Sequence, residues 1–216
     1  MSNSSRLCIE TYTLGPFQVH NYLIWHPEHR QAVLIDSGRA PTAIINTLKE
    51  NTLSLAAIVY THAHIDHVEG QPDILAVYPN TPIWMHEESL FWVSRLALQA
   101  NAFNLPIPED VVTGQKLQPG QSLQFKGFSI EARYCPGHSP CGMTLFVPEA
   151  NWAFPGDVIF AGSVGRTDFP RGDWPTLKAS IEREVWTLPP ETVLYPGHGS
   201  PTTVAHEKAT NPYLLA

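Results

Sequence analysis

The run from Thr61 to His67 places three histidines and an aspartate within six residues, directly after the apolar, strand-like stretch Ala56 to Tyr60. Imidazole and carboxylate groups held this close together lose hydration and conformational freedom, and a bound divalent cation is the commonest way to offset both losses. We therefore expect the chain to fold so that a strand delivers this run to a metal site.

The composition is that of an ordinary globular protein, with 43% apolar and 15% charged residues among 216. The excess of 20 Asp and Glu over 13 Lys and Arg gives a formal charge of −7, which disfavours a duplex nucleic-acid binder. The start, Met1 to Cys8, lacks the apolar core of a signal peptide, and no stretch approaches the roughly 18 apolar residues of a membrane span. We expect a soluble, cytoplasmic protein without membrane partners, and the oligomeric state stays open.

The first half of the chain begins with strand signals and then alternates between strands and helices. Strands are expected at residues 9–13, 20–25, 32–35, 56–60 and 82–85, and helices from Pro41 and over residues 87–102. The first three strands form an antiparallel set. In the second helix, Leu90, Val93, Ala97 and Ala100 are the expected buried face.

The second half resembles the first in the order of its elements. Strands are expected at 123–125, 128–134, 144–147, 152–154 and 192–195, with a helix that Asp173 caps and that runs to about Trp186. Two such halves predict an α/β layered protein, with two sheets packed face to face and helices outside, rather than a parallel barrel. We expect one domain over residues 1–216.

Three more potential ligands stand just beyond predicted strands, beside glycine or proline: His138, Asp157 and His198. Loops at strand ends aim side chains without disturbing the packed sheets. If the Thr61–His67 run is an extended loop, two cations can divide the seven donors. One is held by His62, His64 and His138, the other by Asp66, His67 and His198, with Asp157 bridging them. A hydroxide between the cations is then the predicted nucleophile.

The other histidines, His20, His26, His29, His86 and His206, stand alone in the sequence, and we interpret them as surface or core residues. Cys135 and Cys141 flank His138. We interpret both as small buried thiols, although an extra metal or redox role stays open.

The seven-ligand pattern resembles that of the metallo-β-lactamase fold, and the resemblance covers essentially the whole chain. It implies an αβ/βα sandwich with a binuclear site at one edge. The stretch Gly162 to Asp173 and the ending Asn211-Pro212-Tyr213 further resemble the short bacterial glyoxalase-II-type hydrolases. That resemblance implies hydrolysis of a glutathione thioester, notably S-D-lactoylglutathione, in methylglyoxal detoxification.

The same resemblance implies roles for single residues. Two divalent metal ions, zinc with iron or manganese as alternatives, would activate the hydroxide and polarise the thioester carbonyl. Asp66 would orient the hydroxide or accept its proton, and Arg166 would anchor a glutathione carboxylate. A surface turn in which Arg166 pairs with Asp168 is the competing interpretation. Only 18 residues follow His198, so we expect much of the basic glutathione pocket that a helical extension gives longer glyoxalase II enzymes to be absent, with Lys208 as a weak substitute.

Other functions share this scaffold. The stretch Gly165 to Phe169 also resembles that of persulfide dioxygenases. Those enzymes use one iron, held by residues at the positions of His62, His138 and Asp157. A β-lactamase is disfavoured because those enzymes usually carry Cys or Ser where Asp157 stands, and a nuclease would need a more basic surface. A non-enzymatic metal or redox sensor that uses Cys135 and Cys141 also stays open.

Overall fold

The first sheet contains the predicted opening set and the α/β strands that follow it. The computed structural model describes residues 7–215, so most of the stretch inspected for a signal peptide (residues 1–6) lies outside it. The sheet has six strands in chain order: β1 (Cys8–Leu14), β2 (Val19–His26), β3 (Gln31–Ile35), β4 (Ser54–Val59), β5 (Ile83–Met85) and β6 (Gln115–Lys116). The pairs β1–β2 and β2–β3 are antiparallel, and the later pairs are parallel.

The second sheet also has six strands, in the order β14-β13-β10-β9-β8-β7. They are β7 (Ser122–Phe125), β8 (Phe128–Tyr134), β9 (Met143–Val147), β10 (Trp152–Gly156), β13 (Val193–Pro196) and β14 (Thr202–Thr203). Here β10 and β13 are parallel, and the other pairs are antiparallel. A small hairpin of β11 (Ile159–Phe160) and β12 (Ser163–Val164) follows β10.

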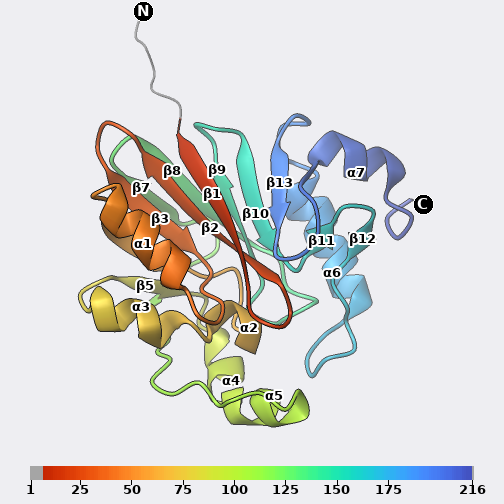
Figure 1. Cartoon of the computed structure of the whole chain (residues 1–216). Coiled ribbons are helices and arrows are strands. Elements are labelled where there is room, and N and C mark those ends of the chain that lie inside the picture. Colours follow the sequence, from red (N-terminus) through yellow and green to blue (C-terminus); the bar gives the residue numbers. More distant parts are fainter. Residues whose placement is uncertain (1–6, 216) are drawn as a thin grey trace, which may run out of the picture.

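The two sheets pack face to face with helices on both outer sides, as the sequence predicted (Figure 1). Helices α1 (Thr42–Glu50) and α3 (Gln71–Val77) cover the first sheet, and α6 (Trp174–Ser180) and α7 (Val204–Thr210) lie beside the second. Successive side chains of β2 point to opposite faces of the first sheet, and both faces are buried. Leu23 packs toward the helices, whereas Tyr22 and Ile24 pack between the sheets. Because both faces of the sheet are buried, the sequences of its strands are nearly continuous runs of apolar residues.

The predicted helix after Asp173 is present, and its cap is the predicted one. The Asp173 carboxylate accepts a hydrogen bond from the Thr176 backbone N–H at 2.9 Å. Helix α6 continues into a π-helical turn, η1 (Ile181–Val185), and Leu177, Ile181 and Val185 are all completely buried against the second sheet.

The predicted single helix over 87–102 is wrong. The segment forms two short helices, α4 (Ser89–Val93) and α5 (Leu96–Ala102), because the backbone leaves helical geometry at Arg95 (φ −121°, ψ 15°). The break rotates the buried face. Leu90 is 62% exposed and Ala97 is exposed, whereas Trp92 and Leu96 are buried, and Ala100 alone of the predicted face is fully buried.

The expected extended loop over the histidine run is also wrong in part. Residues 61–64 form a loop in which His64 is extended, but Ile65–Val68 forms a short helix, α2, which contains Asp66 and His67. Within residues 7–215, no helix is long and apolar enough to cross a bilayer.

Candidate metal centre

All seven predicted donors meet at one edge of the sandwich, although they come from widely separated places in the chain. His62 and His64 follow β4, Asp66 and His67 lie on α2, His138 lies in the loop after β8, Asp157 follows β10, and His198 follows β13. The strands end at a common edge, so each loop delivers its side chain to the same place.

His62, His64 and His138 form the first donor group. His64 Nδ1 lies 3.0 Å from His62 Nε2 and 3.0 Å from His138 Nε2, and all three side chains are buried. Three imidazole nitrogens at a common point suit a tetrahedral cation, since nitrogens bound at about 2.1 Å lie roughly 3.4 Å apart.

Asp66, His67 and His198 form the second donor group. Asp66 Oδ2 lies 3.3 Å from His198 Nε2 and 3.7 Å from His67 Nε2. Because α2 winds between residues 65 and 68, Asp66 and His67 can reach this group while His64 reaches the first. The short helix thus produces the division that the sequence analysis assigned to an extended loop.

Asp157 lies between the two groups. Its Oδ2 is 3.7 Å from His138 Nε2 in the first group and 3.5 Å from His198 Nε2 in the second, while its Oδ1 is 3.5 Å from His67 Nε2. Gly165 makes this placement possible, because a Cβ there would overlap the Asp157 carbonyl oxygen.

The donor set fits divalent cations. His67 Nε2 and Asp157 Oδ1 are buried, and neither has a partner at hydrogen-bonding geometry. Orphaned buried polar atoms are costly, and a cation between them would satisfy both. Imidazole and carboxylate donors accommodate zinc, iron or manganese, so the geometry supports divalent metal without selecting one.

The two groups differ in protonation. Burial and neighbouring histidines hold the pKa of His62 and His64 well below the usual range, so these imidazoles are neutral donors. Burial acts to lower the pKa of His67, but Asp66, Asp36 and Asp157 outweigh it and hold that pKa well above the usual range. Burial also opposes protonation of His198, but hydrogen bonds to Asp157 and Asp66 raise its pKa to about 9. Metal binding at the second group must therefore displace protons.

Asp36 is a supporting residue that the sequence analysis missed. Its Oδ2 lies 2.8 Å from His67 Nδ1 and accepts a hydrogen bond from Thr61 Oγ1 at 2.7 Å, and its Oδ1 accepts one from the Thr61 backbone N–H at 2.8 Å. A His67 that donates through Nδ1 turns Nε2 toward the donors. The available signal is a carboxylate directly after β3, and in the sequence it looks only like the end of a strand.

The backbone of Arg166 supports the first group in the same way. His138 Nδ1 lies 2.7 Å from the Arg166 carbonyl oxygen, which leaves His138 Nε2 for the site. Helix α7 also forms hydrogen bonds with the β11–β12 hairpin, which comes just before Arg166 in the chain. The buried Glu207 carboxylate accepts hydrogen bonds from the Gly162 backbone N–H and the Asn211 amide, and Asn211 also donates to the Ser163 carbonyl. The Asn211 of the predicted C-terminal motif therefore has a structural contact.

The Arg166 side chain forms the surface ion pair that the competing interpretation predicted, and its role as a substrate anchor stays a prediction. It forms a paired ion bridge with Asp168 (Nε–Oδ1 and Nη2–Oδ2, each 2.6 Å), and its hydrogen bonds lower the pKa of Asp168 to about 2. It also lines a cavity of about 720 Å³ beside the donors. Lys208 is exposed on α7 and does not line that cavity.

The remaining histidines and the cysteines are not among the metal donors, although the His20 backbone N–H donates to the carbonyl of Gly197, next to His198. Among the described residues, the donor groups contain none of the five other histidines. His86, for example, stacks on Tyr134 at 4.4 Å. Cys135 and Cys141 are buried as expected, and burial raises the pKa of both thiols, that of Cys135 to about 12.

The model of the metallo-beta-lactamase superfamily matches residues 14–198. The chain belongs to this superfamily. Crystal structures of other members have the same fold. The BLEG-1 B3 metallo-beta-lactamase is 31% identical with a TM-score of 0.90, covering 97% of this chain and 100% of that one. TTHA1623, in a di-iron-bound form, is 37% identical with a TM-score of 0.85, covering 95% and 100%.

Two curated relatives differ in activity. Hydroxyacylglutathione hydrolase GloC of Haemophilus influenzae is 37% identical over 208 residues, which cover 95% of this chain and 97% of that protein. The mitochondrial persulfide dioxygenase ETHE1 of Homo sapiens is 32% identical over 200 residues, covering 89% and 70%. The superfamily and a divalent metal centre are therefore established more firmly than the substrate.

Proposed function

We propose that this protein is a binuclear metallohydrolase that cleaves a glutathione thioester, with S-D-lactoylglutathione giving D-lactate and glutathione. The observation that carries the proposal is the position of Asp157, whose carboxylate faces both three-residue donor groups. The similarity to a hydroxyacylglutathione hydrolase over nearly the whole of both chains supports the choice of thioester.

Two divalent cations in these groups would supply an acidified water and a polarised carbonyl oxygen. The chain supplies the orientation. Asp66 lines the cavity, with its Oδ2 3.3 Å from His198 Nε2, and would orient the attacking water or accept its proton. Water adds to the carbonyl carbon, the carbon–sulfur bond breaks, and the sulfur leaves with one proton, so no protein nucleophile is required.

A mono-iron persulfide dioxygenase is the second candidate, supported by the ETHE1 relative and by the presence of His62, His138 and Asp157. The second donor group argues against it. One iron held by those three residues leaves no role for Asp66, His67 and His198, which nevertheless form a second donor group beside Asp157.

The test compares two activities in the wild type and in His198→Ala. Protein reconstituted with zinc, manganese or iron is assayed for loss of S-D-lactoylglutathione and, in parallel, for oxygen uptake with glutathione persulfide. A thioesterase with two cations should hydrolyse the thioester and lose at least about 100-fold in kcat/KM when His198 is removed. His206→Ala is the matched control, because His206 is exposed on α7.

Oxygen uptake that survives His198→Ala, without thioester hydrolysis, would replace the proposal with the dioxygenase. A β-lactam substrate should also be included, given the similarity to the BLEG-1 enzyme. Turnover of the β-lactam in place of the thioester would equally refute the proposal.

A further inference from the structure

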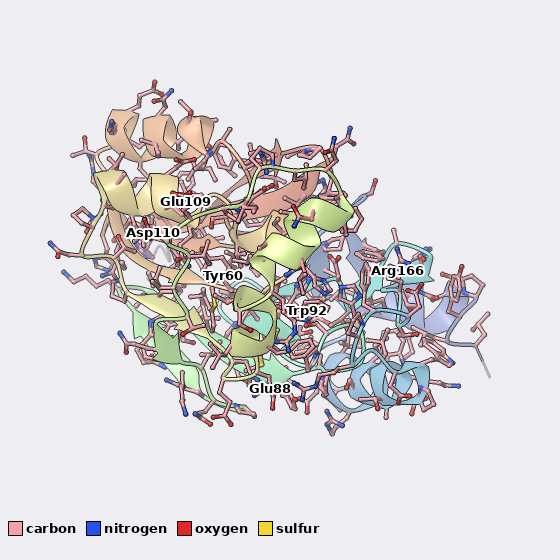
Figure 2. The ribbon with its side chains drawn as sticks, turned by 90° about the horizontal axis from the view of Figure 1, so that it is seen from below. Tyr60, Glu88, Trp92, Glu109, Asp110 and Arg166 are labelled. Atoms are coloured by element: carbon pink, nitrogen blue, oxygen red, sulfur yellow. The ribbon has the colours of Figure 1, made fainter. Side chains whose placement is uncertain are left out.

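The cavity beside the metal donors has two walls, both lined mainly by apolar side chains. One is built from the β11–β12 hairpin and the loop after it, which carries Arg166 and Phe169. The other is built from α4, α5 and the turn between β1 and β2. Figure 2 places Trp92 beside the α4–α5 segment and Arg166 beside the β11–β12 segment.

The α5 wall is apolar and open to solvent. Leu98 is 67% exposed and Phe103 is 44% exposed, yet both line the cavity together with Phe17. The rings of Phe17 and Phe103 meet edge to face at 5.0 Å. Large apolar side chains gathered beside a reactive centre commonly mark a binding surface.

This apolar surface continues to the metal donors. Trp92, next along the wall, packs against His64 with ring centroids 4.6 Å apart, and its indole N–H is occupied by a hydrogen bond to Ser139 Oγ. An acyl substituent that extends from the reacting carbonyl in this direction therefore meets mainly aromatic and aliphatic carbon, since the Gln99 amide on this wall is already bonded to Ile65 and Trp92.

Positive charge in the cavity is limited and already engaged. Among the described lining residues, the arginine and lysine side chains are those of Arg95 and Arg166. Arg95 donates to the Phe91 carbonyl and to Ser94 Oγ, and Arg166 is paired with Asp168. The side chain of Arg166 is 57% exposed, so it can turn toward a carboxylate at the cavity mouth. The Arg166 wall therefore offers a guanidinium to a carboxylate of a peptide thiol carrier, away from Phe17, Leu98 and Phe103.

We propose that the acyl group of the substrate is apolar or aromatic and binds against Phe17, Leu98 and Phe103, while the thiol carrier lies along the Arg166 wall. This inference rests on the proposed hydrolysis of a glutathione thioester, and it favours an acyl group larger and more apolar than lactoyl. A lactoyl group offers one methyl and one hydroxyl, which leaves most of the α5 wall in contact with water. A cavity of about 720 Å³ accommodates a much larger acyl group beside the carrier.

The test uses two thioesters that differ only at the acyl group. S-mandeloylglutathione has a phenyl ring where S-lactoylglutathione has a methyl, and both keep the α-hydroxyl. Hydrolysis consumes one water in each case: the carbon–sulfur bond breaks, the carboxylic acid keeps the water oxygen, and the sulfur takes a proton. Each kcat/KM is divided by the rate of uncatalysed hydroxide hydrolysis of the same thioester, so that differences in intrinsic reactivity cancel.

We expect the corrected kcat/KM of the metal-reconstituted protein to favour the mandeloyl thioester by at least about tenfold. The variants Leu98→Ser and Phe103→Ser should each lower this preference about threefold or more, because each removes apolar contact with the ring. Leu90→Ser is the matched control. Leu90 lies on α4, is 62% exposed and does not line this cavity, so its replacement should leave the preference unchanged.

Hydrolysis of both thioesters with the lactoyl compound preferred would overturn the acyl-group inference and leave the proposed function standing. So would a mandeloyl preference that neither variant changes, or variants that alter only the oligomeric state in size-exclusion chromatography. No hydrolysis of either thioester would refute the proposed function and this inference with it. Circular dichroism of each variant separates these outcomes from misfolding.

Discussion

Replacement of Asp36 by Asn tests whether the metal centre depends on a residue that does not contact the cavity. Asp36 is 2% exposed, and its carboxylate accepts hydrogen bonds from the backbone N–H and the hydroxyl of Thr61. Its Oδ2 also lies 2.8 Å from His67 Nδ1. Asn has nearly the same shape but only one acceptor oxygen. If this oxygen faces His67 and Thr61 Oγ1, the amide N–H groups must face the Thr61 backbone N–H.

The structure allows an estimate of both consequences. One charge-assisted hydrogen bond is lost and one buried donor is left unsatisfied, which should lower the free energy of unfolding by about 2 to 3 kcal/mol. Weaker orientation of His67 should reduce cation affinity at the second donor group by about 10- to 100-fold. Asp36 is joined to the first group through Thr61 Oγ1, which lies 3.1 Å from His62 Nδ1, so the affinity of that group should stay close to that of the wild type.

Urea unfolding of the metal-free protein measures the first effect, and competitive titration with a chromophoric chelator measures the second. The Asp36→Asn variant should bind one cation normally and a second one weakly. Asp73→Asn is the control, because Asp73 is an exposed carboxylate in the first turn of α3. If two cations bind to Asp36→Asn with wild-type affinity, Asp36 does not orient His67 for metal binding and the reasoning is refuted.

The remaining predictions concern two glycines, His198 and Cys135. Gly165→Ala should displace the Asp157 backbone, since the new Cβ would overlap the Asp157 carbonyl oxygen. Metal analysis should then find at least one cation fewer per protein molecule than in the wild type. Gly162→Ala, with φ +68° and open space around it, should instead cost only about 1 kcal/mol in thermal unfolding and keep the metal. Because the pKa of His198 is raised to about 9 in the metal-free protein, cation affinity should rise with pH up to about 9, as chelator competition can measure. By the same raised pKa, His198 stabilises the metal-free protein below about pH 6.5, and unfolding should show this contribution lost as pH rises toward 9. Finally, Cys135 should react with a thiol reagent only as fast as the protein unfolds, and rapid labelling of the native protein would contradict its burial.

The sequence was informative where periodicity or chemistry is local. The two-sheet sandwich followed from apolar strand runs, the Asp173 cap from its position, and the donor set from the crowding of histidines. Prediction from the sequence failed where tertiary contacts determine the local structure. Apolar periodicity over 87–102 did not reveal the break at Arg95, which allows Trp92 and Leu96 to pack inward while Leu90 faces solvent.

The residues that support the site were harder to predict than its ligands. A carboxylate after a strand, such as Asp36, looks like any turn until its partner His67 is known from the fold. The cavity walls have no local signature either, because Phe17, Leu98 and Phe103 come from segments that only the packing of α5 beside the β1–β2 turn brings together.

The origin of the donors in both sheets has a consequence for how the protein resists unfolding. His62 and His64 extend from the first sheet, whereas His138 and His198 extend from the second, so cations between them would cross-link distant parts of the chain. Such a link restricts the unfolded chain as a disulfide does, and it closes a large loop without any oxidation. Only the assembled sandwich brings these donors together, so a chelator should remove the link between the two sheets. The thermal unfolding temperature should then depend on the concentration of free metal.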